Sequence, residues 1–282
     1  MEAHEIQKYQ NTQLQLLEYT DKLCKELGIT YYMIGGTLLG AVRHGGFIPW
    51  DADIDIAMPR ADYERFLAYW RENPSEKYFY QHHTTEPNHL SPHAVLRLKG
   101  THVVMKKRLS ARYKPAEDGI YLDVFPLDEP PLEEKKQVKQ SKAIRRLQRV
   151  IELKAAYTYG AATGKLKSFA KKAVQLCLLP FSLPWLNGQM DAQMRKYTGC
   201  GSGHLVSMAS HYSYRKQYMD AAIYGTPQRI PFEGGLYCAP AQTDAYLKQI
   251  YGNYMELPPV EKRYGDLDTI ARIDYGTEDA SL

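Results

Sequence analysis

The sequence predicts a mixed α/β (α+β) fold, in which a small mixed sheet is flanked by helices. Apolar residues recur at spacings of three and four over residues 6–27 and 242–251, as in helices that pack on a core. Short runs rich in β-branched and aromatic residues lie between such helical segments. Hydrophobic residues make up 44% and charged residues 24% of the chain, which is ordinary for a globular protein and excludes a disordered one.

The N-terminal third alternates predicted helices and strands. In chain order we expect helices over residues 6–27, 38–44 and 63–71 and strands over residues 30–34 and 53–58. Gly28 ends the first helix, and Thr37 is suited to cap the second. Pro59 ends the second strand, and Asp62 opens the third helix.

The rest of the chain is less regular. Residues 94–98 and 103–105 predict a hairpin around Gly100, and residues 120–125 predict a further strand. Most of residues 133–179 is expected to be helical. From these changes we expect a catalytic core at residues 1–130, a basic and mostly helical insert at 131–200, and a C-terminal segment at 201–282 that completes the site.

The net charge of +4 hides an uneven distribution. Residues 135–172 hold twelve basic side chains and one acid, Glu152, so this segment carries +11 and the rest of the chain carries −7. Such a block suits an anionic membrane face, a polyanionic acceptor or a solvated helix surface. Nucleic acid is disfavoured because no nucleic-acid motif accompanies the charge.

Several protein classes are excluded by simple patterns. The four cysteines are scattered and form no CxxC pair, so neither a disulfide scaffold nor a structural zinc site is expected. The N-terminus has no apolar segment typical of a secretory signal, and no apolar run is long enough to span a membrane. We therefore expect a cytoplasmic protein, with peripheral contact at the inner face of the membrane open to residues 135–186.

Asp53 and Asp55 are the first candidates for chemistry. Side chains two apart on a strand point to the same face, so their Cβ atoms lie within about 7 Å. Carboxylates this close repel one another unless a cation lies between them or one takes up a proton. Hard oxygen ligands of this kind suit Mg²⁺. A solvated pair at a strand end would give the same pattern.

Gly35 and Gly36 make the prediction of a site for a metal and a phosphate more specific. They follow an apolar strand and precede a helix, whose first N–H groups suit a phosphate. A third carboxylate is expected from a neighbouring strand, and Asp123 lies in an otherwise apolar one. Pairing of Asp123 with an arginine at a sheet edge is the alternative. Asp128 is interpreted as a turn residue.

The sequence GGTLLGAVRHGGFIPWDADIDIAMPRADYERF resembles the signature of the LicD family, the phosphocholine transferases of the nucleotidyltransferase-fold superfamily, which is similar to fukutin-type proteins. The resemblance extends to GIYLDVFPLD and YGNYMELPPVEKR and so covers most of the chain. It implies a nucleotidyltransferase-like fold in which Gly35 and Gly36 are the glycine pair. By the same resemblance Asp53, Asp55 and Asp123 are catalytic metal ligands. Ala52 departs from the family's usual acidic run, which affects only a peripheral contact.

The resemblance implies a reaction. CDP-choline or another CDP-alcohol would donate its phospho-alcohol to a hydroxyl of a glycan or lipid-linked glycan precursor, of teichoic acid, capsule or lipopolysaccharide type, and release CMP. One or two Mg²⁺ or Mn²⁺ ions would assist, and Asp123 would help to deprotonate the hydroxyl. Candidate donor or phosphate contacts are Gly35, Gly36, Thr37, Arg43, His44 and Arg97, and weaker candidates are Trp50, Asp51, Lys262 and Arg263.

Other interpretations stay open. Arg43, His44 and Arg97 could equally be surface or helix-capping residues. A nucleotidyltransferase that moves NMP to a small molecule would use the same carboxylates and release pyrophosphate instead. A scaffold without activity would keep the fold alone. Choline requires aromatic faces, and among 23 tyrosines the cluster Tyr212, Tyr214 and Tyr218 is one candidate, although their number alone selects none.

Overall fold

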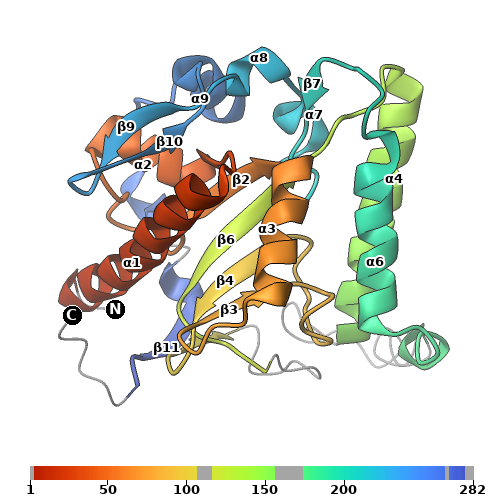
Figure 1. The fold of residues 1–282 in the computed structure, drawn as a ribbon, viewed down its shortest axis with the longest axis horizontal. Helices are drawn as coiled ribbons and strands as arrows, with labels where there is room; N and C mark the ends of the chain where they lie inside the picture. The colour runs from red at the N-terminus through yellow and green to blue at the C-terminus, as the bar shows by residue number, and fades with distance from the viewer. Residues whose placement is uncertain (1–2, 107–115, 156–173, 264–266, 277–282) are drawn as a thin grey trace.

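The computed structural model describes residues 3–106, 116–155, 174–263 and 267–276 (Figure 1). Its α-helices are α1 (Ala3–Leu27), α2 (Gly35–His44), α3 (Arg60–Glu72), α4 (Glu134–Ala155), α6 (Leu183–Met194), α7 (Tyr214–Gln217), α8 (Ala221–Tyr224) and α9 (Thr243–Tyr251). Its strands are β1 (Tyr32–Met33), β2 (Asp55–Pro59), β3 (Tyr78–Gln81), β4 (Ala94–Leu98), β5 (His102–Met105), β6 (Tyr121–Leu127), β7 (His204–Leu205), β8 (Met219–Asp220), β9 (Gln228–Phe232), β10 (Gly235–Ala239) and β11 (Ile270–Asp274). Short 3-10 helices are η2 (Arg195–Tyr197), η3 (Val260–Lys262) and η4 (Leu267–Thr269).

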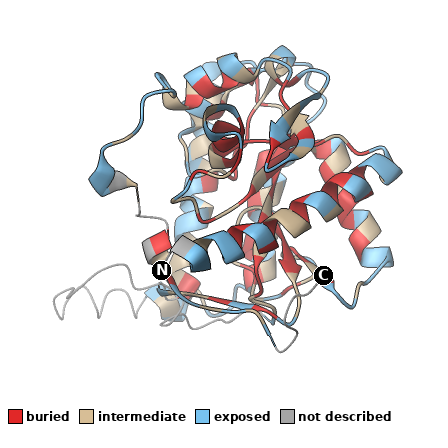
Figure 2. Ribbon diagram, turned by 90° about the vertical axis from the view of Figure 1, so that its left-hand side faces the viewer, coloured by how far each residue is buried: buried red, intermediate tan, exposed pale blue. Residues whose placement is uncertain are grey.

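A mixed five-stranded sheet lies at the centre, in the order β1-β2-β6-β4-β3. Strands β2 and β6 pair in parallel, and the other neighbours are antiparallel. Helices α1 and α3 both cross the sheet on the side that faces the viewer in Figure 1. Buried residues gather on the strands and on the inward faces of the helices (Figure 2). The predicted mixed α/β class is therefore confirmed.

The first helix shows how the sequence pattern becomes packing. Leu16, Leu17 and Leu23 of α1 are buried, as the spacing of three and four predicts. Gly28 follows the helix with φ +60°, a left-handed conformation that favours glycine.

Two local predictions were wrong. Residues 94–98 and 103–105 do not form a hairpin, because β4 pairs with β3 and β6 while β5 pairs with the distant β11. Helix α2 begins at Gly35, so Thr37 lies inside it and is not its cap. The Thr37 hydroxyl instead accepts a hydrogen bond of 2.8 Å from the Asp55 N–H and so fixes the start of β2.

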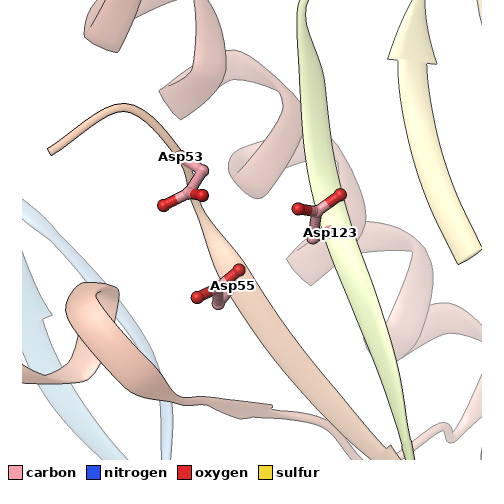
Figure 3. A group of neighbouring side chains, drawn as sticks. All are labelled: Asp53, Asp55 and Asp123. Carbon is pink, nitrogen blue, oxygen red and sulfur yellow. The ribbon is translucent and has the colours of Figure 1, made fainter. Parts of the chain in front are cut away.

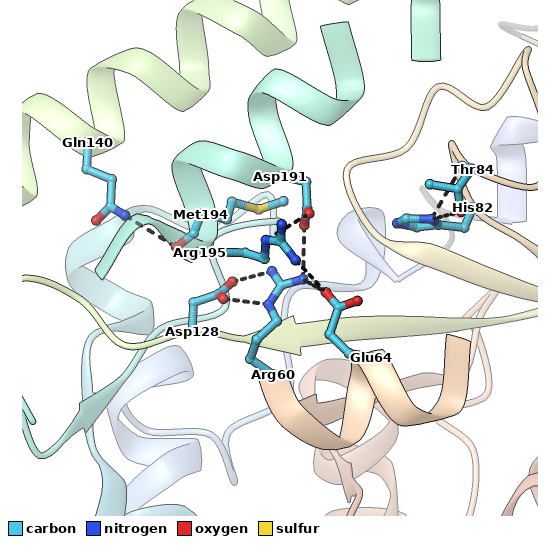
Figure 4. Close-up of polar contacts among 9 residues, drawn as sticks. All are labelled: Arg60, Glu64, His82, Thr84, Asp128, Gln140, Asp191, Met194 and Arg195. Atoms are coloured by element: carbon cyan, nitrogen blue, oxygen red, sulfur yellow. Dashed lines mark hydrogen bonds and ion pairs between the residues drawn. The ribbon is translucent and has the colours of Figure 1, made fainter. Parts of the chain in front are cut away.

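Asp128 is not a turn residue, contrary to expectation, because it forms a β-bridge with Val206 directly after β6. It is fully buried and accepts two hydrogen bonds of 2.7 Å from Arg60 of α3 (Figure 4). Arg60 also donates to Asp191 of α6 at 2.9 Å. Burial lowers the pKa of Arg60, but the nearby Asp128 carboxylate more than offsets this effect and raises the pKa above its usual value. The guanidinium therefore stays charged. This network joins three elements that are far apart in the chain.

Helices α4 and α6 pack side by side to form an arm along one side of the molecule (Figure 1). Gln140 of α4 joins them by donating a hydrogen bond of 2.8 Å to the Gln193 carbonyl. The C-terminal part of the chain returns to the core, where α9 packs against α2 and β10 lies beside β1. No helix within the described ranges combines the length and apolarity that a bilayer crossing demands.

Candidate active site

Three carboxylates converge at the sheet. Asp55 on β2 and Asp123 on β6 are register partners in the parallel pair, and Asp53 lies just before β2. Each offers an oxygen, and these three atoms all lie within 4.8 Å of one another (Figure 3). All three side chains are partly exposed. The third carboxylate thus comes from the neighbouring strand, where the sequence placed it.

The glycine pair makes room for Asp55 and for the nearby Asp51. A Cβ atom on Gly35 would lie 2.8 Å from the Asp55 Oδ2, and one on Gly36 would lie 2.3 Å from the Asp51 Oδ2. Gly35 also has φ +56°, which an L side chain rarely adopts. Both glycines line the cleft at the first turn of α2, whose N-terminus favours negative charge.

Helix α1 holds the loop that carries Asp51 and Asp53. The Gln10 amide donates hydrogen bonds of 3.2 Å to the carbonyls of Ile48 and Asp51. The Gln13 amide donates to the Ala52 carbonyl at 3.1 Å and to the Tyr121 carbonyl of β6 at 3.2 Å. Both glutamines are buried, so the loop and β6 are held by the same helix face.

Tyr9 of α1 is a buried residue near the acids. Its side chain is fully buried, and its hydroxyl has no hydrogen-bond partner within the described structure. Burial raises the pKa of Tyr9 well above its usual value, and Tyr121, Asp53 and Asp123 raise it further. The hydroxyl therefore stays protonated, and it is close enough to Asp53 and Asp123 for their charges to act on it.

His93 is a site residue that the sequence analysis missed. Its Nε2 lies 3.3 Å from the Asp123 Oδ1, and its ring lies 4.2 Å from that of Phe125, centroid to centroid. The ring thus lies against the Asp123 carboxylate and restricts its orientation. Within the described residues the ion-pair partner of Asp123 is His93 and not an arginine.

A large cleft of about 1020 Å³ surrounds these groups. Its wall combines Gly35 and Gly36 with all three carboxylates, residues before and on β4, part of α4, and two C-terminal stretches. From α4 come Gln148 and Glu152, the only acid of the basic block. The predicted insert and C-terminal segment both contribute to this cleft.

The three basic side chains predicted to contact phosphate differ in burial and in their position relative to the cleft. Arg43 lines the cleft and donates a hydrogen bond of 2.8 Å to the Tyr254 carbonyl. Arg97 also lines it but is buried, and it donates to the Gln81 amide oxygen at 2.7 Å and to the Gly119 carbonyl at 2.8 Å. His44 is exposed and does not line the cleft. Arg43 is therefore the best placed of the three to reach a phosphate.

Two of the four weaker candidates, Trp50 and Asp51, line the cleft. The guanidinium of Arg263 lies 5.4 Å from the Trp50 ring centroid. Asp51 accepts a hydrogen bond from the Ala52 N–H at 3.2 Å. The side chain of Lys262 lies outside the described part of the structure. Thr37 is buried and does not line the cleft.

Of the tyrosine cluster considered, Tyr212 alone lines the cleft. Tyr214 instead donates to Gln140 at 2.9 Å, and Tyr218 stacks on His204. Tyr251 and Tyr254 line the cleft beside Tyr212, and the rings of Tyr212 and Tyr251 meet edge-on at 5.8 Å. The C-terminal segment therefore contributes three tyrosines to the wall of the cleft.

The residues missed by sequence reasoning have recognisable but weak signals. Gln10 and Gln13 lie on the apolar face of the first helix, where a polar residue needs a buried partner. Tyr9 shares that face. His93 precedes a predicted strand, and nothing in the linear sequence connects it with Asp123.

Comparisons with known proteins give matches to one family. Residues 28–150 match the family described as "LicD/FKTN/FKRP, nucleotidyltransferase domain". The chain is 29% identical over 256 residues to the lipopolysaccharide cholinephosphotransferase LicD of Haemophilus influenzae, covering 88% of this chain and 90% of that protein. It is 45% identical over 40 residues to the human ribitol 5-phosphate transferase FKRP, which covers 14% of this chain and 8% of that protein. Residues 28–150 thus match the nucleotidyltransferase domain of the LicD family, and the chain is similar to a LicD protein along most of its length.

Proposed function

We propose that this protein transfers phosphocholine from CDP-choline to a hydroxyl of a lipopolysaccharide-type glycan precursor in a Mg²⁺-dependent reaction that releases CMP. The match to this family domain and the similarity to a cholinephosphotransferase support a phosphotransferase enzyme. The similarity to a lipopolysaccharide cholinephosphotransferase along nearly the whole chain supports the group transferred and the acceptor class. The observation that carries the proposal is the convergence of three carboxylates beside the glycine-lined start of α2.

The carboxylates fit a divalent cation. Three acids whose oxygens lie within 4.8 Å repel one another strongly without a positive charge between them. The acids also lie beside the first turn of α2, whose backbone N–H groups suit a phosphate that a cation would bridge. We propose Asp53, Asp55 and Asp123 as the ligands. When bound, Mg²⁺ would neutralise phosphate charge and polarise the phosphorus that is attacked.

The protein's own groups orient the reactants. The first turn of α2 places backbone N–H groups at Gly35 and Gly36, which suit the donor phosphates. Arg43, in the last turn of α2, also lines the cleft and supplies positive charge. Asp123 is the proposed acceptor of the proton from the attacking hydroxyl, and His93 holds its carboxylate in place from 3.3 Å.

The tyrosines suit the choline end of the donor. A quaternary ammonium group forms no hydrogen bonds through its nitrogen and is recognised by aromatic faces. We propose that Tyr251 and Tyr254, with Tyr212 beside them, line this end of the cleft. Burial raises the pKa of Tyr251, and Tyr212 raises it further, so the Tyr251 ring remains neutral at physiological pH.

A donor screen with product analysis tests the proposal. The purified chain is incubated with Mg²⁺, a lipopolysaccharide acceptor and CDP-choline, CDP-ethanolamine or CDP-ribitol, and the nucleotide products are separated. We expect CMP, with CDP-choline as the preferred donor. Preference for CDP-ribitol would retain the chemistry but overturn the choline assignment. Pyrophosphate from an NTP, without CMP from any CDP-alcohol, would show a nucleotidyltransferase instead.

A further inference from the structure

We propose that the arm formed by α4 and α6 docks this protein on an anionic membrane surface. The site proposed is the solvent-facing side of α4 together with the apolar end of the arm at residues 174–185. This membrane-docking surface uses no residue assigned to the reaction.

The solvent-facing side of α4 is strongly cationic. Its exposed basic side chains are Lys135, Lys136, Lys139, Lys142, Arg145, Arg146 and Arg149. Five of them form one stripe at spacings of four, three, four and three, namely Lys135, Lys139, Lys142, Arg146 and Arg149. Within the described residues, Lys136 is the single exposed cation of α4 with an ion-pair partner, Glu133. The charge of the stripe therefore has no neutralising partner within that part of the chain.

The other side of α4 explains why the stripe faces solvent. Gln140, Ile144 and Ile151 are buried, and the helix packs along α6 on that side. Gln140 reaches the last turn of α6 through its hydrogen bond to Gln193. One face of α4 thus packs against the rest of the protein, and the opposite, cationic face is accessible to a partner.

The end of the arm is apolar and exposed. Val174, Leu176, Leu179, Phe181 and Trp185 are all among the exposed large hydrophobic residues. Phe181 and Trp185 stack with their centroids 5.2 Å apart. Lys154 donates a hydrogen bond of 3.0 Å to the Leu178 carbonyl, and Gln175 donates one of 2.9 Å to the Leu153 carbonyl. These bonds attach the apolar end to the end of α4.

This combination favours a membrane over a soluble polyanion. A polyanion would use the cationic stripe but would gain nothing from exposed Leu, Phe and Trp side chains. A bilayer with anionic lipids uses both, since basic residues are attracted to its surface and apolar side chains enter the headgroup boundary. Tryptophan is also favoured at that boundary, because its ring has an apolar body and a polar N–H.

Helix α4 carries both the cationic stripe and part of the cleft wall. Gln148 and Glu152 of the same helix line the cleft. A membrane that contacts the stripe would therefore lie near the cleft wall that α4 forms. If the proposed function holds, this would bring a lipid-linked acceptor close to the donor.

Vesicle binding by the full chain tests the proposal independently of catalysis. The chain is mixed with vesicles of phosphatidylcholine alone or with phosphatidylglycerol, and binding is measured by co-sedimentation. We expect binding only with phosphatidylglycerol, and weaker binding at high salt. Tryptophan emission should shift to shorter wavelength on binding, and Trp185→Phe should remove most of that shift because Trp70 is buried and Trp50 lies under Arg263.

Matched variants test whether vesicle binding depends on the stripe itself or only on the total positive charge of the protein. Replacing Lys139, Lys142 and Arg146 together by Gln should lower vesicle affinity by at least about tenfold. Replacing Lys22, Arg71 and Lys77 together by Gln removes the same charge from other exposed positions and should change affinity little. Replacing Phe181 and Trp185 by Ser should also weaken binding. Each variant should retain the circular dichroism of the unmodified chain.

Several results would overturn the proposal. They are the absence of binding to anionic vesicles by the unmodified chain, equal binding to phosphatidylcholine alone, or an equal loss in both triple variants. Binding to soluble polyphosphate without binding to vesicles would show a polyanion site instead. Because vesicle binding needs neither donor nor metal, its failure would leave the proposed transfer reaction standing, and an inactive chain that binds vesicles would leave the docking surface standing.

Discussion

Asp55 and Asp123 lie opposite one another on neighbouring parallel strands, as register partners in the pairing of β2 with β6. This pairing brings together carboxylates from distant parts of the chain, and Asp53 joins them within 4.8 Å. A two-residue sequence motif thereby becomes a three-carboxylate site.

Removing one charge from this site should abolish most activity. Asp55→Asn or Asp123→Asn is expected to lower turnover by at least about a hundredfold and to weaken Mn²⁺ binding, because an amide replaces a charged ligand. Steady-state assays and titration with Mn²⁺ check both effects. Asp118→Asn, in a pair with His102 away from the cleft, is the control and should behave normally. Near-normal turnover in both site variants would refute the assignment.

Alanine substitutions at Gly35 and Gly28 distinguish the effect of a steric clash from the effect of backbone strain. Both have a left-handed conformation, but only at Gly35 would a Cβ atom meet a neighbour, the Asp55 carboxylate. Gly28→Ala and Gly35→Ala should each cost about 1 kcal/mol of unfolding free energy from strain. Gly35→Ala alone should also lower turnover and Mn²⁺ affinity. Equal activity in the two variants would show that the close approach to Asp55 is not required.

Tyr9→Phe should have effects of opposite sign on stability and metal binding. Deleting a buried hydroxyl without a partner should raise the free energy of unfolding of the metal-free protein by about 1 kcal/mol. If that hydroxyl donates to a metal-bound water, Mn²⁺ affinity should fall about tenfold. Tyr224→Phe deletes another buried hydroxyl without a described partner and should stabilise without changing metal affinity. Unchanged Mn²⁺ affinity in Tyr9→Phe would separate Tyr9 from the site.

The Arg60 network should matter for stability rather than chemistry. Arg60→Met leaves Asp128 buried without its two charged hydrogen bonds and is expected to cost about 3–5 kcal/mol of unfolding free energy. Lys248→Met, which removes an exposed ion pair with Asp244, should cost less than about 1 kcal/mol. Urea denaturation measures both. Adding Asp128→Leu to Arg60→Met should recover part of the loss, and no recovery would contradict this explanation.

Two buried histidines should make the protein sensitive to mild acid. Burial lowers the pKa of His82 to about 2 and that of His89 to about 3, and nearby positive groups lower the pKa of His82 further. Below about pH 6.5 the unfolded chain therefore takes up protons that the folded chain does not. Stability should fall as pH decreases from 6.5 towards 3, by up to about 1.4 kcal/mol per pH unit for each histidine.

Urea denaturation at pH 7, 6 and 5 measures this slope. A double variant, His82→Gln with His89→Gln, should flatten it, whereas His4→Gln, on the exposed start of α1, should leave it unchanged. Stability that stays constant or rises on acidification would contradict the prediction.

The sequence alone determined the parts of this protein that depend on near neighbours. The period of α1, the turn at Gly28, and the order of Gly35, Gly36, Asp53 and Asp55 follow from local spacing and backbone conformation. The mixed α/β class follows from the alternation of such elements.

Only the tertiary structure decided which distant residues meet. The pairing of β5 with β11, the contact of His93 with Asp123 and the burial of Asp128 against Arg60 all join separate segments. Local propensity carries no information about such partners, because they are selected by how whole helices and strands pack and by the need to pair every buried polar group. For the same reason Gln10 and Gln13, polar residues on an apolar face, gain a role only when α1 lies against the loop and strand that they hold.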